Sequence, residues 1–281
     1  MVETCYAAPS CPVSIALVTD THNSPADAVL ENLCRRKPAL ILLAGDFVYA
    51  APPTVPGRLK MLDSRYALSL LQGCAAVAPT FVSLGNHEWM LNDFDLERVT
   101  SCGVTVLDNR YTSISVGSAK LCIGGLSSAR FTAYQTWRQK QPAAFLYPGP
   151  DRTVWTGKPE PRIDWLDDFE RQSGYRILLC HHPEYVPSYL KDRSIDLIVS
   201  GHAHGGQWRY YSRRRQEWRG VYAPGQGLLP KLTGGVHGNH IISRGLSNNA
   251  PIPRLNNPPE LVYILPLDGQ GSAHHESGSF R

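Results

Sequence analysis

The chain has 281 residues, of which 42% are hydrophobic and 19% charged, and a formal net charge of +4. This composition is typical of a globular protein with a sizeable core, and the length is compatible with a single domain. The small positive charge does not repel an anionic substrate, but it is too small to indicate nucleic-acid binding by itself.

The seven cysteines are scattered, odd in number and without a CxxC pair. This pattern argues against a disulfide framework and a zinc–thiolate site, and it favours a reducing compartment. The N-terminal residues lack a basic segment, and their apolar run is too short for a signal peptide or a membrane span. We therefore expect a cytoplasmic protein without a membrane partner.

The first part of the chain alternates strands and helices. Continuous apolar runs predict buried strands at 13–18, 39–44 and 80–84. Helical periodicity predicts helices at 26–36 and 60–72. This alternation favours a parallel central sheet with right-handed crossovers, and hence an α/β fold.

The rest of the chain is predicted to be richer in strands. Short antiparallel strands are expected at 104–107, 111–116 and 120–124, a helix at 161–171, buried strands at 176–180 and 195–200, and more sheet at 207–211, 220–223, 239–243 and 261–265. Residues from about 128 to 162 are rich in Pro, Gly and aromatic residues, which predicts a lid insertion. We expect one domain over 1–267 and a disordered polar tail over 268–281.

Polar clusters follow five of the predicted strands. In chain order they are Asp20-Thr-His22, Gly45-Asp46, Gly85-Asn86-His87-Glu88, His181-His182-Pro183 and Gly201-His202-Ala-His204. Open α/β sheets bind ligands at the carboxyl ends of their strands, so loops far apart in sequence can converge there. Hydrolysis of a phosphoester needs charge neutralisation and an activated water, and two divalent ions supply both. The mixed oxygen and nitrogen donors suit Mn²⁺, Fe²⁺, Zn²⁺ or Ni²⁺ better than Ca²⁺.

These clusters resemble the calcineurin-like metallophosphoesterase family, whose pattern D-x-H, GD, GNH[E], H, GHxH is present in full and in order. The resemblance implies a layered α/β/β/α sandwich of two mixed sheets flanked by helices. It implies two divalent transition-metal ions, with manganese expected first, and His87 as the group that faces the substrate. One ion would be bound by Asp20, His22, Asp46 and His204, and the other by Asp46, Asn86, His181 and His202.

A finer resemblance covers the last third of the chain, where Gly201–Gln207, Ser243–Leu246 and Asn257–Glu260 look like the bacterial phosphodiesterase-like branch of that family. It implies hydrolysis of a phosphodiester in a small organic phosphate. A phosphomonoesterase or nuclease at the same site is the alternative, and a non-catalytic scaffold is a distant one, because no expected ligand is missing. The chain departs from the common GD-x-x-D pattern at Tyr49, so the surroundings of the metals should differ.

Several residues keep two interpretations. Arg244 could bind phosphate or pair with an acid, and His237 or His240 could touch substrate. His182 and Glu88 are expected to be neighbours of the ligands, and Cys180 a core residue. Arg213–Arg215, close to tryptophans and tyrosines, could bind nucleic acid, but a hairpin tip with solvated charges is the favoured interpretation. The sequence does not indicate an oligomeric state.

Overall fold

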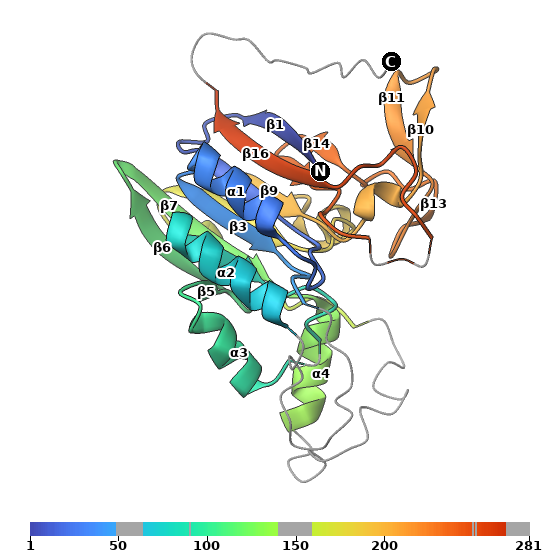
Figure 1. Ribbon diagram of the computed structural model, residues 1–281. Coiled ribbons are helices and arrows are strands. Elements are labelled where there is room, and N and C mark those ends of the chain that lie inside the picture. Colours follow the sequence, from blue (N-terminus) through green and yellow to red (C-terminus); the bar gives the residue numbers. More distant parts are fainter. Residues whose placement is uncertain (49–63, 90, 140–158, 249, 251, 268–281) are drawn as a thin grey trace.

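The computed structural model describes residues 1–48, 64–89, 91–139, 159–248, 250 and 252–267. It confirms the layered α/β/β/α architecture, with two six-stranded mixed sheets packed face to face and helices on their outer sides (Figure 1). No helix in this described part combines the length and apolar character that a membrane crossing needs.

The first sheet has the strand order β1-β16-β2-β3-β4-β5. Strands β2, β3, β4 and β5 are parallel, whereas β16 is antiparallel to β2 and parallel to β1. Helices α1, α2 and α3 connect its central strands. The bounds are β1 Val2–Ala8, β2 Ile15–Val18, α1 Asp27–Arg36, β3 Leu40–Ala44, α2 Arg65–Val77, β4 Thr80–Ser83, α3 Asp93–Thr100, β5 Thr105–Val106 and β16 Glu260–Pro266.

The second sheet has the order β14-β15-β9-β8-β7-β6, in which the four central strands are parallel. Two further strand pairs, β10–β11 and β12–β13, lie outside both sheets. The bounds are β6 Arg110–Val116, β7 Ala119–Leu126, α4 Ala129–Gln139, α5 Leu166–Glu170, β8 Tyr175–Cys180, a π-helical turn η3 Val186–Leu190, β9 Leu197–Ser200, a 3₁₀ turn η4 His204–Gly206, β10 Arg209–Ser212, β11 Glu217–Gly220, β12 Tyr222–Ala223, β13 Gly227–Leu228, β14 Gly235–His237 and β15 His240–Ile242.

The strands are apolar on both faces because both faces are covered. Ile15 and Leu17 of β2 pack between the two sheets, whereas the alternate residues Ala16 and Val18 pack against the helices of the first sheet. On β8, Leu178 faces the outer layer that contains α5. Such double burial explains why the sequence shows continuous apolar runs here rather than alternation.

The sequence prediction is wrong in three places. Residues 104–107 do not form an antiparallel strand, because β5 pairs in parallel with β4 after a crossover through α3, a helix that the sequence did not reveal. Of the helix expected at 161–171, only Leu166–Glu170 is helical. The interval 128–162 begins with a regular helix, α4, whose Phe131 packs in the core. Strand β1 was also not predicted.

Other expectations fall partly or wholly outside the described residues. The helix expected at 60–72 is seen from Arg65 and runs on to Val77. The remaining part of the lid interval, residues 140–158, and the tail at 268–281 are not among the described residues, so the lid and the disordered tail stay predictions. Residues 213–215 connect β10 to β11, which agrees with the hairpin-tip interpretation, and Cys180 is fully buried in the core.

The burial of His240 in the second sheet makes the stability of the fold depend on pH. Its Nε2 lies 2.7 Å from Ser200 Oγ, which itself donates to the Cys180 carbonyl, so Nε2 carries the imidazole proton. Burial lowers the pKa of His240 from 6.5 to about 3. The unfolded state therefore binds one more proton between these pH values, and the folded state loses stability as the pH falls through this window.

We predict that His240→Gln, which keeps an N–H donor but does not titrate, reduces the slope of unfolding free energy against pH. The reduction between about pH 6 and pH 4 should approach 1.4 kcal/mol per pH unit, the value for one proton. Urea unfolding at a series of pH values measures it. An unchanged slope in the variant would contradict a neutral buried His240.

Candidate metal centre

Five loops converge past the carboxyl ends of β2, β3, β4, β8 and β9. Backbone hydrogen bonds tie them together: the Asp20 N–H donates to the Gly45 carbonyl (3.2 Å), and the Gly201 N–H donates to the His181 carbonyl (3.1 Å). The second of these bonds joins the loops after two neighbouring parallel strands. Polar clusters as far apart in sequence as Asp20 and His202, 182 residues, therefore lie in one place, as the strand-end pattern predicted.

Asp46 lies at the centre of this cluster. Its side chain is 1% exposed, and its Oδ2 lies 3.0 Å from His181 Nε2, 3.9 Å from His22 Nε2 and 3.9 Å from His87 Nε2. The other oxygen, Oδ1, accepts a hydrogen bond from the His87 backbone N–H at 2.8 Å. A carboxylate that faces imidazole nitrogens from several loops has the position that a ligand shared by two cations requires.

His181 is oriented by the strand beside it. Its Nδ1 lies 2.7 Å from the Ala44 carbonyl oxygen, which can only accept, so Nδ1 carries a proton and Nε2 faces Asp46. Burial lowers the pKa of His181, but the Asp46 carboxylate outweighs burial and raises that pKa to about 10. The space between the two side chains therefore favours positive charge, which a proton or a metal ion can supply.

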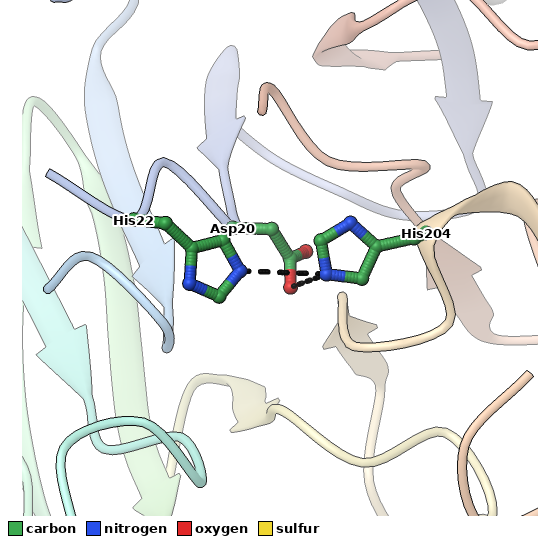
Figure 2. Close-up of side chains that lie close together, drawn as sticks. All are labelled: Asp20, His22 and His204. Carbon is green, nitrogen blue, oxygen red and sulfur yellow. Dashed lines mark hydrogen bonds and ion pairs between the residues drawn. The ribbon is translucent and has the colours of Figure 1, made fainter. Parts of the chain in front are cut away.

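A second group consists of Asp20 and His22, from the loop after β2, and His204, from the loop after β9, whose side chains point toward one another (Figure 2). His204 Nε2 lies 3.4 Å from Asp20 Oδ1 and 3.4 Å from His22 Nε2. Burial lowers the pKa of His22 to about 4 and also lowers the pKa of His204. Both imidazoles are thus neutral near pH 7, the form that binds metal.

The remaining expected ligands complete the first group. His202 joins Asp46 and His181 in a set whose ligand atoms all lie within 4.8 Å of one another. Its backbone N–H donates to both oxygens of Asp20 (3.1 and 3.2 Å). Asn86 Oδ1 is buried and has no hydrogen-bond partner among the described residues. An unpaired buried amide oxygen is costly, and a cation there would satisfy it.

The donor set therefore fits two divalent ions, one beside Asp20, His22 and His204 and one beside His181 and His202, with Asp46 between them. One contact must change on binding. Arg254 Nη2 lies 3.0 Å from His204 Nδ1, and a guanidinium only donates, so in this geometry the proton of neutral His204 is on Nε2. Ligation through Nε2 requires that proton to move to Nδ1 and displace Arg254.

The backbone of the ligand loops is strained. Five expected ligands have φ in the left-handed region, where a side chain is unfavourable: Asp20 (54°), His22 (45°), Asp46 (53°), His202 (63°) and His204 (46°). Residues held in such conformations concentrate at functional sites, where the surrounding structure imposes them.

Two glycines in the motifs allow close approach rather than unusual dihedral angles. A Cβ on Gly85 would lie 2.2 Å from Asp46 Oδ1, and a Cβ on Gly201 would lie 2.4 Å from Asp20 Oδ2. Each carboxylate thus packs directly against the backbone of a neighbouring loop. This contact is the physical reason for a glycine in front of Asn86 and in front of His202.

His87 lies at the accessible side of the cluster. Its side chain is 24% exposed, whereas those of Asp46 and His181 are almost fully buried. The His87 ring meets the His22 ring edge to face, with 4.7 Å between ring centroids. Burial lowers the pKa of His87 despite the nearby Asp46 carboxylate. His87 can therefore reach a bound substrate while its backbone remains fixed to Asp46.

Glu88 joins two ligand loops, in agreement with its expected supporting role. It is fully buried, and its carboxylate accepts from the backbone N–H groups of Asp46 (2.9 Å), Gly85 (2.6 Å) and Val48 (3.2 Å). Burial and the Asp46 charge raise the pKa of Glu88 to about 8. These bonds hold the loops after β3 and β4 in register.

Glu184 is a site residue that the sequence did not single out. Its Oε1 lies 3.0 Å from His182 Nδ1 and 3.7 Å from His202 Nε2, and His182 Nε2 lies 2.8 Å from Ser128 Oγ. A carboxylate behind a metal-binding histidine orients the ring and strengthens it as a ligand. The sequence feature that could have identified Glu184 is its position three residues after the expected ligand His181. As expected, His182 is a neighbour of the ligands.

The expected substrate contacts are not brought to the cluster. Arg244 Nη2 donates to Glu260 Oε1 at 2.8 Å, and Glu260 is fully buried. Of the two interpretations of Arg244, the structure therefore supports pairing with an acid and not binding of a phosphate. His237 is exposed and pairs with His240 at the beginning of β15, whereas the metal centre lies past the carboxyl end of the parallel strand β9. The geometry therefore gives no support to either contact.

Comparison with known proteins agrees with this geometry. The chain is 27% identical over 209 residues to a putative metallophosphoesterase of Caenorhabditis elegans, which covers 69% of this chain and 37% of that protein. It is 26% identical over 213 residues to phosphodiesterase YaeI of Escherichia coli, which covers 71% of this chain and 63% of YaeI. The chain thus spans less than two thirds of either relative.

Among solved structures, a dimetal phosphatase from Danio rerio matches with a TM-score of 0.42 and 15% identity, over 83% of this chain and 87% of that one. A family model described as calcineurin-like phosphoesterase matches residues 13–206. That match covers more than half of the chain and includes all seven expected ligands, from Asp20 to His204, so the chain belongs to the calcineurin-like phosphoesterase family.

Proposed function

We propose that this chain is a metal-dependent phosphodiesterase that acts on a small organic phosphate. The observation that carries the proposal is the position of Asp46, whose carboxylate faces imidazoles of both ligand groups. When bound, two divalent ions would neutralise the phosphate oxygens and lower the pKa of a water. We expect manganese to support the activity.

The side chains of the protein have separate tasks. Seven residues hold the ions: Asp20, His22, Asp46, Asn86, His181, His202 and His204. His87, on the accessible side, is placed to hydrogen-bond the phosphate or to protonate the departing alkoxide. The hydrogen bond from its backbone N–H to Asp46 keeps it beside the ligand cluster.

The cations around the site favour a diester over a monoester. A monoester carries additional negative charge, which side-chain cations would have to clamp. Arg254 donates to the backbone carbonyls of Arg244 and Ser247, and Arg244 is paired with Glu260. Neither guanidinium is available for a phosphate. The name of the relative YaeI, a phosphodiesterase, points the same way.

One observation favours the alternative, a phosphomonoesterase. Arg130, at the beginning of α4, lies with its guanidinium 4.7 Å from the centroid of the Trp89 ring. Burial is the main cause of the lowered pKa of His87, and the positive charge of Arg130 adds to it. The positive charge of Arg130 therefore acts on His87 and would attract the additional negative charge of a monoester held there.

We predict that the manganese-loaded protein hydrolyses bis(p-nitrophenyl) phosphate and that removal of the metal by a chelator abolishes turnover.

Asp46→Asn should lose both metal and turnover, because it removes the negative charge that faces both ion positions. His87→Asn should keep the metal but lose about 10²- to 10⁴-fold in kcat, the usual contribution of a proton-transfer group. Elemental analysis and steady-state kinetics measure the two effects. Full activity of Asp46→Asn would remove Asp46 from the mechanism.

Glu184→Gln should weaken the binding of one ion by about 10- to 100-fold, because His202 loses its orienting carboxylate. Calorimetric titration of the metal-free protein with Mn²⁺ measures the affinity without reference to turnover. Glu31→Gln, on the exposed side of α1, is the matched control. Equal affinities of the two variants would show that Glu184 does not position His202.

Arg130→Ala separates diester from monoester hydrolysis. If diesters are the substrates, the variant should change kcat/KM for bis(p-nitrophenyl) phosphate less than about threefold, as expected for an exposed charge. A loss of about 10-fold or more that is confined to p-nitrophenyl phosphate, together with a faster wild-type rate on that monoester, would favour the phosphomonoesterase.

A further inference from the structure

The β10–β11 hairpin, residues 209–220, stands away from the two sheets (Figure 1). Tyr211 and Trp218 are opposite each other in this pair, with 5.7 Å between ring centroids, and they are 49% and 47% exposed. On the other face of the same pair, Tyr210 is 40% exposed. Large, partly exposed aromatic side chains thus lie on both faces of this two-stranded element.

Exposed aliphatic side chains lie at the base of this hairpin. Leu228 is 77% exposed and Leu229 59% exposed, and the Leu229 N–H donates to the carbonyl of Val221, directly after β11. On the other strand, Trp208 forms a bridge with Leu255, which is 55% exposed. We call this surface, from the hairpin to Leu228, Leu229 and Leu255, the hairpin patch. Exposed apolar side chains gathered on neighbouring segments in this way mark an interaction surface.

The hairpin patch also lies in a segment with a strong local excess of positive charge. Residues 207–231 contain six Lys or Arg against one Glu, an excess that is larger than the +4 of the whole protein. Three of these charges, Arg213, Arg214 and Arg215, are consecutive and exposed at the hairpin tip. The partner of the hairpin patch should therefore be anionic and also able to accept apolar side chains.

We propose that the hairpin patch docks on the surface of an anionic lipid bilayer. Tyr and Trp prefer the interface between headgroups and acyl chains, and clustered arginines are attracted by anionic headgroups. A nucleic-acid strand would accept the arginines and stack on the aromatic rings, but it offers nothing to Leu228 and Leu229. The expectation of no membrane partner came from the lack of an apolar span, and surface docking needs none.

The hairpin patch is directly connected to one of the loops of the metal centre. The Val221 N–H donates to the carbonyl of Gly206, two residues after the expected ligand His204. A docked bilayer would therefore lie beside the loop that carries the expected ligands His202 and His204. Binding itself does not depend on the proposed hydrolysis, so the two proposals can fail separately.

The test is co-sedimentation of the full chain with vesicles of phosphatidylglycerol and phosphatidylcholine, and with vesicles of phosphatidylcholine alone. We expect binding only to the anionic vesicles, weakened by salt. Replacing Arg213, Arg214 and Arg215 together with Ala should lower the partition coefficient on the order of 100-fold. Replacing Arg35, Arg36 and Lys37, three consecutive exposed cations on and after α1, with Ala is the matched control and should change it far less.

A second variant tests the apolar part. Leu228→Ser with Leu229→Ser should weaken vesicle binding on the order of 10-fold, because less hydrocarbon is withdrawn from water. The proposal would be overturned if the protein bound neither kind of vesicle, or if the arginine variant and its control lost binding equally. It would also be overturned if the protein bound a single-stranded oligonucleotide but not vesicles. A wild-type dimer that the Leu variant converts to monomer would also overturn it, because a second copy would then cover the patch.

Discussion

The structure of the metal centre depends on the burial of the Asp46 carboxylate. Taking a carboxylate out of water costs several kcal/mol unless positive charge compensates it. Here the difficulty is greater, because the Asp20 carboxyl group is also fully buried in the same cluster of loops. His22 is neutral near pH 7 since burial lowers its pKa to about 4. Cations held between the carboxylates and the imidazoles are therefore the arrangement that best balances this charge.

The loops also carry a conformational cost. Five expected ligands are in the left-handed region, and at about 1 kcal/mol each the total is on the order of 5 kcal/mol. That sum is comparable to the whole stability margin of a typical domain. It can be tolerated because the loops follow strands buried on both faces and because Glu88 and the inter-loop backbone bonds hold them. Cation binding to the folded state adds further stability.

The sequence was sufficient for those parts of the fold and site that local pattern determines. Continuous apolar runs located the buried strands, and a polar cluster after each run located the loops that converge. Contacts between distant segments were not predictable in this way. Arg254 meets His204 across 50 residues, and β1 pairs with β16 near the other end of the chain. Helix α4 was missed because its aromatic residues and low periodicity resemble those of a loop.

The arginines near the centre show how binding of metal and recognition of substrate are divided between parts of the fold. Arg244 and Arg254 are used by the protein itself, since Arg244 binds Glu260 and Arg254 binds two backbone carbonyls. In the described part of the chain, these loops thus supply ligands and His87 but no available cation. In the proposed enzyme, selectivity would therefore come from elements outside these loops. Arg130 on α4 and the exposed hairpin beyond η4 lie on separate elements next to the same loops, so either can change without disturbing the metal ligands.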